Sequence, residues 1–339
     1  MRPTKERPDA TLGQPGLLAL VALLAVGCTV DSIPTVVREG GAAQFSWLDD
    51  AEWGEPVHLG SEVNSVFSDF DPSVSKDGLT LYFTAGVQRG GFGLRDIWVA
   101  KRASVDAAWG TPTNLGSVIN TTAHESKPSI SADGHRLYFA SNRTGGFGQF
   151  DIYVSYREHK HDESGWGAPV NLGSVINTAG NEESGITFFE DDAGVVTMFL
   201  SSQRAGGVGG LDIYSTTLQA DGSFGPVQLV AELSTSAADV DPSVRKDGLE
   251  LFLASNRTGT FGANDLWVSR RASTLDAWSA PVNLGGSINT PPRDPSLEQA
   301  NDSRPWLSHD GTTLYFNAAF RAGNLSEMFD IWSTTRSKK

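Results

Sequence analysis

Hydrophobic and polar residues alternate in short runs along most of the chain, and glycine-containing turns separate the runs. Runs such as residues 137–141 and 151–156 have the length and the two-residue period of β-strands. No stretch after residue 28 shows helical periodicity, so the pattern predicts an all-β protein. Asp-Gly pairs between neighbouring runs predict tight hairpin turns in which both residues have positive φ: Asp77-Gly78, Asp133-Gly134, Asp247-Gly248 and Asp310-Gly311.

The strand pattern repeats five times, and each copy ends on an Asp-Ile-aromatic or Asp-Leu-aromatic triplet. A copy holds four predicted strands, for example 109–115, 128–131, 137–141 and 151–156. Four short strands per repeat are typical of β-propeller blades. The first copy begins with a strand at 53–59, and the last copy ends at 330–335 with no strand after it. We therefore expect these two segments to pair and to close a ring of five four-stranded blades.

The second repeat carries a recognisable motif. It reads Pro-Ser-Ile-Ser-x-Asp-Gly from Pro128, then Leu-Tyr-Phe-x-Ser-Asn-Arg-x-Gly-Gly-Phe-Gly, then Asp-Ile-Tyr. In this motif the chain resembles the WD40-like PD40 repeat of bacterial TolB-type β-propellers, over residues 46–337. The third repeat departs from it, with Gly185-Ile186 in place of Pro-Ser. The resemblance implies a cell-envelope protein whose propeller binds other envelope components.

A basic and then apolar segment opens the chain. The apolar run 17–26 has ten residues, about half of the roughly 20 that a membrane-spanning helix needs. It ends at Gly27-Cys28, and residues 24–28 resemble the lipobox of bacterial lipoproteins, whose cysteine is acylated. We expect 1–27 to be a lipoprotein signal peptide, Cys28 to be lipidated and 28–45 to form an anchor and linker. The resemblance favours the outer membrane, and an ordinary cleaved signal peptide is the alternative.

Composition excludes several classes of protein. The chain has 40 Asp and Glu against 26 Lys and Arg, a net charge of −14, so a nucleic-acid partner is not expected. A single cysteine excludes an intramolecular disulfide and a thiolate zinc cluster. We expect a monomeric propeller without a cofactor or a metal ion.

Three charged positions recur in every repeat, and antiparallel topology places them on one face of the ring. Because all five copies carry them, we favour a structural network in which each arginine bridges two carboxylates. The alternative is a ring of carboxylates that binds a cation or a basic ligand at the channel mouth. The arginines are Arg89, Arg143, Arg204, Arg257 and Arg321; the aspartates after them are Asp96, Asp151, Asp212, Asp265 and Asp330; the acids before them are Asp69, Glu125, Glu182, Asp239 and Asp302.

The fifth repeat contains an insertion. Pro305 lies sixteen positions after Asn289, against eight positions between the equivalent residues of the first three repeats. Departures from a repeat are where function is expected, and this loop falls on the charged face. We weigh a ligand-contacting loop, with Arg293, Asp294 and Glu298 as candidates, equally against a tolerated surface insertion.

No catalytic motif with a serine, cysteine or zinc centre is present. We therefore expect a lipid-anchored, non-catalytic propeller that binds an envelope protein or peptidoglycan. The alternative is a glycoside hydrolase, because five-bladed propellers can host two carboxylates around a central pocket. Against it, the acids recur beside arginines in every repeat, whereas an acid and a base need different environments. The candidates for such a pair are Asp69, Asp71, Glu125, Glu182, Glu183, Asp239 and Asp241.

Overall fold

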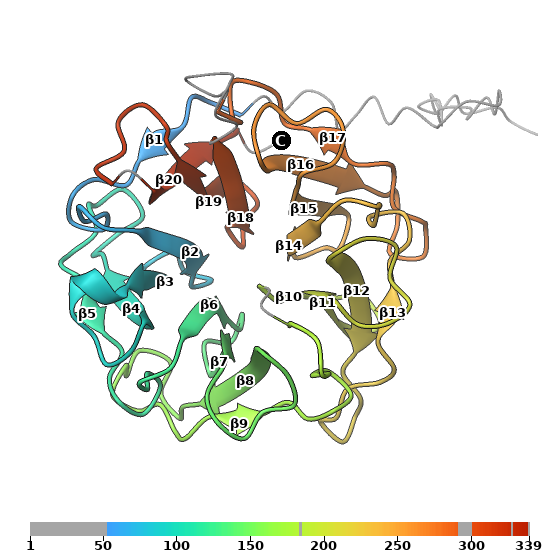
Figure 1. Cartoon of the computed structure of the whole chain (residues 1–339), viewed down its shortest axis with the longest axis horizontal. Coiled ribbons are helices and arrows are strands. Elements are labelled where there is room, and N and C mark those ends of the chain that lie inside the picture. The colour runs from blue at the N-terminus through green and yellow to red at the C-terminus, as the bar shows by residue number, and fades with distance from the viewer. Residues whose placement is uncertain (1–52, 183–184, 291–299, 327, 338–339) are drawn as a thin grey trace, which may run out of the picture. The chain divides into compact units, whose positions relative to one another are not determined.

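A computed structural model describes residues 53–182, 185–290, 300–326 and 328–337. Within these ranges, the strands form five four-stranded antiparallel sheets, arranged as the blades of a five-bladed β-propeller (Figure 1). The predicted fold class is confirmed. The predicted signal peptide, Cys28, Glu183 and the loop with Arg293, Asp294 and Glu298 lie outside the described residues. No helix in the described part of the chain is long and apolar enough to cross a membrane.

Each blade begins with a strand at the propeller axis and ends with a two-residue strand at the rim (Figure 1). Four blades are continuous in sequence, and the fifth takes its outermost strand from the start of the described chain. From the axis outward, the blades are β2 (Asp69–Val74), β3 (Thr80–Gly86), β4 (Arg95–Lys101) and β5 (Thr113–Asn114); β6 (Glu125–Ile130), β7 (Arg136–Ser141), β8 (Asp151–Tyr156) and β9 (Val170–Asn171); β10 (Thr187–Glu190), β11 (Val196–Ser202), β12 (Asp212–Thr217) and β13 (Gln228–Leu229); β14 (Asp239–Val244), β15 (Glu250–Ser255), β16 (Asp265–Arg270) and β17 (Val282–Asn283); and β18 (Asn301–Leu307), β19 (Thr313–Ala319), β20 (Phe329–Thr335) and β1 (Val57–His58).

The outermost strands are shorter than predicted. The strand expected at 109–115 pairs only at Thr113 and Asn114, although Gly110 N donates a hydrogen bond to Lys101 O at 2.8 Å. Pro112 lacks an N–H group and interrupts the ladder between them. Trp109 leaves the sheet and packs in the core, where the Arg102 guanidinium lies 4.2 Å from the centre of its ring.

The hairpin turns also differ from the prediction. Only the glycines have positive φ, for example 75° at Gly78 and 70° at Gly248, and the preceding aspartates do not. The reason is that the loops are longer than two residues: Ser75 N donates to Thr80 O, so that four residues lie between the paired positions. Such loops are built on an ordinary turn that ends with a single left-handed residue.

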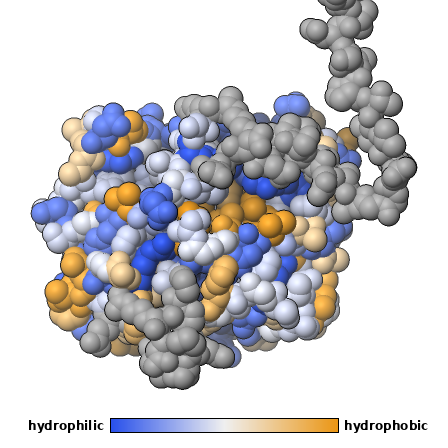
Figure 2. Space-filling model, turned by 90° about the horizontal axis from the view of Figure 1, so that it is seen from above, coloured by the Kyte–Doolittle hydropathy of each residue, from blue (hydrophilic) through white to orange (hydrophobic). Residues whose placement is uncertain are grey.

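Hydrophobic packing joins each blade to its neighbours. Among the described residues there are five core clusters, and each combines side chains from two adjacent blades. One of them joins the last blade to the first, through Tyr315 and Ile331 against Leu81 and Phe83. Seen from its edge, the propeller exposes scattered hydrophobic residues among hydrophilic ones (Figure 2).

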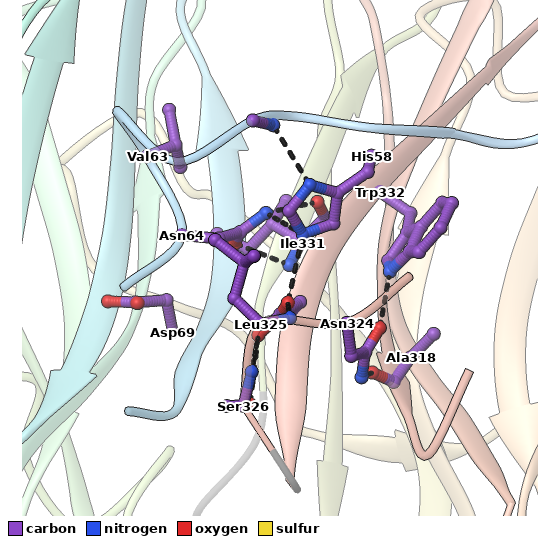
Figure 3. Close-up of polar contacts among 12 residues, drawn as sticks. His58, Val63, Asn64, Asp69, Ala318, Asn324, Leu325, Ser326, Ile331 and Trp332 are labelled. Carbon is purple, nitrogen blue, oxygen red and sulfur yellow. Dashed lines mark hydrogen bonds and ion pairs between the residues drawn. The ribbon is translucent and has the colours of Figure 1, made fainter. Parts of the chain in front are cut away.

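The ring closes between the first and last strands, as predicted. β1 pairs antiparallel with β20, through Val57 opposite Ser333 and His58 opposite Trp332. Asn64 adds two further hydrogen bonds, since its side chain donates to Ile331 O at 2.9 Å and accepts from Ile331 N at 2.8 Å (Figure 3). Closure therefore covers both edges that an open ring would expose.

His58 replaces an asparagine in this closing pair. Its Nε2 lies 2.9 Å from Asp330 Oδ2, and its Nδ1 accepts a hydrogen bond from Gly60 N (Figure 3). In three other blades, an asparagine side chain of the outermost strand donates a hydrogen bond from Nδ2 to the carboxylate of the equivalent aspartate, at N–O distances of 2.7 to 2.8 Å. These pairs are Asn114 with Asp96, Asn171 with Asp151 and Asn283 with Asp265.

The closing pair makes a direct prediction about stability. His58→Ala removes a hydrogen bond to the buried Asp330 carboxylate and should lower the free energy of unfolding by about 1–2 kcal/mol. His58→Asn should recover most of this loss, because asparagine fills the equivalent position in three blades. Urea denaturation of the three proteins measures the difference. Equal destabilisation by both substitutions would show that the blades do not close by equivalent contacts.

Candidate functional site

The innermost strands share a kink close to the axis. In β2, β6, β14 and β18 the pairing register shifts by a bulge, and the residue before the proline has a positive φ of 55 to 58°. This conformation is rare and costly for residues other than glycine. The conformation is repeated, but the side chains are not: the kinked residues are Asp71, Lys127, Asp241 and Arg304.

These four side chains meet where the central channel is narrowest. Together with the residues that follow them, they line a space of only about 20 Å³. The Arg304 guanidinium joins the two acids, with Nε 2.8 Å from Asp71 Oδ1 and Nη1 2.6 Å from Asp241 Oδ1. Lys127 Nζ lies 3.3 Å from Asp241 Oδ1, and the Lys127 backbone N–H donates to Asp71 Oδ2 at 3.1 Å.

Burial governs the protonation of both acids. The side chains of Asp71 and Asp241 are 2% and 4% exposed. Loss of solvation raises the pKa of each carboxyl group above its ordinary value, and the charge of Lys127 only partly offsets this. The negative charge of Asp71 raises the pKa of Asp241 further. The pair therefore holds a proton more readily than two solvated aspartates.

A larger pocket opens above this constriction, on the face where the innermost strands begin. It has a volume of about 870 Å³, and Lys127, Asp241 and Arg304 form its floor. Its wall combines amide side chains with aromatic rings, an arrangement that suits the hydroxyl groups and the apolar faces of sugars. The amides are Asn181, Asn264, Asn301 and Asn317, and the rings are Phe67, Phe70 and Phe329.

The recurring arginines and the acids before them lie together, away from this pocket. Ion pairs join Arg89 to Asp69, Arg143 to Glu125, Arg257 to Asp239 and Arg321 to Asp302. In the third blade the contact runs through a hydroxyl group, since Ser202 Oγ accepts from Arg204 Nε and donates to Glu182. All five acids are fully buried, and burial raises the pKa of Asp302 to about 7.

The expectation that each arginine bridges two carboxylates is wrong. Asp96 instead accepts hydrogen bonds from the Phe92 and Gly93 N–H groups of the glycine-rich loop, and the other four aspartates accept loop N–H groups in the same way. The arginine's other side faces a ring: the Arg89 guanidinium lies 5.2 Å from the centre of Trp98. The equivalent rings under the other arginines are Tyr153, Tyr214, Trp267 and Trp332.

Part of this site could be predicted from the sequence. Asp71 and Asp241 are two of the seven predicted carboxylates, whereas Asp69, Glu125, Glu182 and Asp239 belong to the arginine network. Lys127 and Arg304 were missed, although a signal was available: the position before each proline changes charge from repeat to repeat. In the described part of the chain, no group of three His, Cys, Asp or Glu residues could hold a metal ion.

The solved structures that resemble this propeller are mainly glycoside hydrolases. An α-L-arabinofuranosidase from Lactobacillus brevis matches at TM-score 0.55 and 15% identity, over 83% of this chain and 94% of that one. A thermostable family-43 glycoside hydrolase matches at 0.53 and 11%, over 82% and 95%. The GH43_1 enzyme from Xanthomonas citri, complexed with xylotriose, matches at 0.52 and 16%, over 82% and 89%. Comparison with protein-family models and with curated proteins gives no match.

These likenesses overturn the expectation of a non-catalytic scaffold. The alternative expectation from the sequence, ranked second, is a glycoside hydrolase. The reason for that ranking was that acids recur in every repeat beside an arginine. Asp71 and Asp241 do not follow the rule, because Lys127 and Arg304 occupy the equivalent positions of other blades. At 11 to 16% identity the likenesses establish the fold, and the reaction depends on the chain's own residues.

The arginine network should be structural. Arg143→Ala leaves the buried Glu125 carboxylate without its cation and should lower the free energy of unfolding by about 2–4 kcal/mol. Arg136→Ala is the matched control, because its pair with Asp133 is partly exposed to solvent and should contribute at most about 1 kcal/mol. Thermal and urea denaturation measure both. Similar losses in the two variants would contradict a structural role for the buried pair.

Proposed function

We propose that the protein is a glycoside hydrolase whose active site is the axial pocket, with Asp71 and Asp241 as its two carboxyl groups. The observation that carries the proposal is a buried carboxyl pair of raised pKa: Asp241 lies at the floor of a pocket large enough for a sugar, and Asp71 lies beside it in the constriction. Hydrolysis of a glycosidic bond needs one carboxylic acid to protonate the leaving oxygen. It also needs one carboxylate, which activates water or attacks the sugar.

The surroundings of the two aspartates suit different roles. Asp241 contacts both Lys127 and Arg304, and these cations favour its ionised form. We assign it as the carboxylate. Asp71 is equally buried and is paired with Arg304, and we assign it as the acid that gives the proton. Both contact one planar guanidinium, so their nearest oxygens lie within roughly 8 Å, a separation open to either stereochemical outcome.

The shape of the pocket favours attack on chain ends. The space that the two carboxyl groups line is only about 20 Å³, too little for a polysaccharide to thread through. A terminal sugar can enter from the wide side and reach the floor. The similar enzymes are named for arabinofuranosides, for xylan and for β-1,3-galactan, so we propose terminal pentose or galactose units as the substrate class.

The location of the protein is part of the same proposal. The lipobox-like segment that ends at Cys28 supports a lipid anchor in a bacterial cell envelope, in the outer membrane. The resemblance to PD40 repeats of TolB-type propellers supports the same compartment. An anchored hydrolase there would meet glycans outside the cytoplasm. A further partner, an envelope protein or peptidoglycan, stays a prediction.

Activity measurements on the full-length chain test the proposal. We expect it to hydrolyse at least one of the 4-nitrophenyl glycosides of α-L-arabinofuranose, β-D-xylose and β-D-galactose. Asp71→Asn and Asp241→Asn should each reduce kcat by roughly 10²- to 10⁴-fold. Asp106→Asn, at an exposed position away from the axis, should leave kcat unchanged.

Melting temperatures of the three variants separate lost chemistry from lost folding. Wild-type protein that hydrolyses none of these glycosides, nor arabinan or xylan, would contradict the proposal. So would folded Asp71→Asn and Asp241→Asn proteins that keep full activity.

A further inference from the structure

A second pocket lies at the other end of the axis, where the innermost strands end. It has a volume of about 450 Å³. Trp306 lines both this pocket and the constriction, so it forms the floor. Buried apolar side chains from four strands surround it: Val74, Ile130, Val244 and Leu307. Tyr138, Phe188 and Phe189 add three aromatic rings on one side.

Basic residues ring the mouth of this pocket. Lys76, Lys246 and His309 occupy the same position in three blades, two residues after the innermost strand ends. The lysines are exposed at the rim, and both are close enough to His309 to lower its pKa, in addition to the effect of burial. Burial and these two charges therefore favour the neutral imidazole of His309, whose remaining N–H group can donate a hydrogen bond.

The acids nearby form no ion pair with these lysines in the part of the chain that the structure describes, and Asp247 pairs instead with Arg245. Asp77 and Asp247 follow them directly, but each carboxylate accepts a backbone N–H of its own turn, from Leu79 and Leu249 at 3.0 and 3.1 Å. Among the residues that the structure describes, Lys76 and Lys246 have no ion-pair partner.

The lining itself contains two acids. Asp133 pairs with Arg136 at 2.9 Å, which leaves Glu190 on the third blade. The cationic side chains of the lining are Lys76, Lys246 and Arg136, and they outnumber its two acids by one, so the rim attracts anions.

We propose that this pocket binds an organic phosphate monoester with an apolar body. The apolar part would pack against Trp306 and the buried side chains, and the phosphate would lie between Lys76, Lys246 and His309. Ammonium groups are compact point charges that bind phosphate from several directions. In this pocket the apolar surface is at the floor and the basic groups are at the rim. The acyl chains of a phospholipid in a bilayer stay in the membrane, outside the pocket, when its headgroup is bound at the rim. A phospholipid in a bilayer therefore does not fit. The carboxyl pair lies beyond Trp306, in the constriction, and the proposal for this pocket does not depend on its chemistry.

Calorimetric titration of the full-length chain with phenyl phosphate tests the inference. We expect saturable binding with a stoichiometry of one, at least tenfold tighter than that of inorganic phosphate or of phenol. The double variant K76Q/K246Q should weaken binding of phenyl phosphate at least tenfold. K101Q/K160Q is the matched control, because it removes the same charge from lysines that do not line the pocket, and it should bind like the wild type.

Three results would overturn the inference. They are the absence of saturable binding to folded wild-type protein, equal affinity for phenyl phosphate and inorganic phosphate, and equal weakening by the two double variants. Both lysine pairs are surface residues, so melting temperatures near that of the wild type are expected and should be measured. Glycosidase activity does not enter any of these outcomes.

Discussion

Everything at the axis depends on closure of the ring by two residues of β1. The pairing of Val57 and His58 with β20 is short, and side chains complete it: His58 reaches Asp330, and Asn64 holds both backbone groups of Ile331. Closure fixes the number of innermost strands around the axis and the distance between them. It thereby decides which side chains from different blades can touch.

Two kinds of charge cluster result, and they differ in how they repeat. The arginines, the acids paired with them and the rings beneath the guanidinium groups recur in every blade, and they hold the loops to the sheets. The axial cluster has one member in each of four blades and no repeat of the same contacts. Buried ion pairs contribute little net stability against apolar substitutes. An axial set of two acids and two bases is therefore better explained by chemistry than by folding.

Much of the fold could be predicted because its signals are local and occur five times. The Asp-Ile-aromatic triplets located the third strand of each blade, and the count of strands at the two ends predicted closure. The charge pairing could not be read in the same way. Asp96 lies seven residues after Arg89, yet it binds loop amides three and four residues before it, which are closer along the chain.

The meeting of the axial side chains could not be predicted, because it depends on an unusual backbone conformation. A residue before proline is ordinarily extended, and in that conformation Asp71 or Lys127 would be one more strand residue. The positive φ at these positions turns the side chains toward one another, and sequence alone did not indicate it. The preference for a scaffold followed from this gap, because it rested on the acids that repeat and not on the two that break the repeat.

The most direct test of the account is a ¹³C NMR titration of the aspartate carboxyl groups in the full-length chain, with D71N and D241N for assignment. The account predicts that at least one of the Asp71 and Asp241 signals titrates above the ordinary range of aspartate, because both groups are buried beside each other. It also predicts that the pair shifts when a sugar that the enzyme releases is added. Two signals that titrate like solvated aspartate and do not respond to any arabinose, xylose or galactose derivative would contradict it.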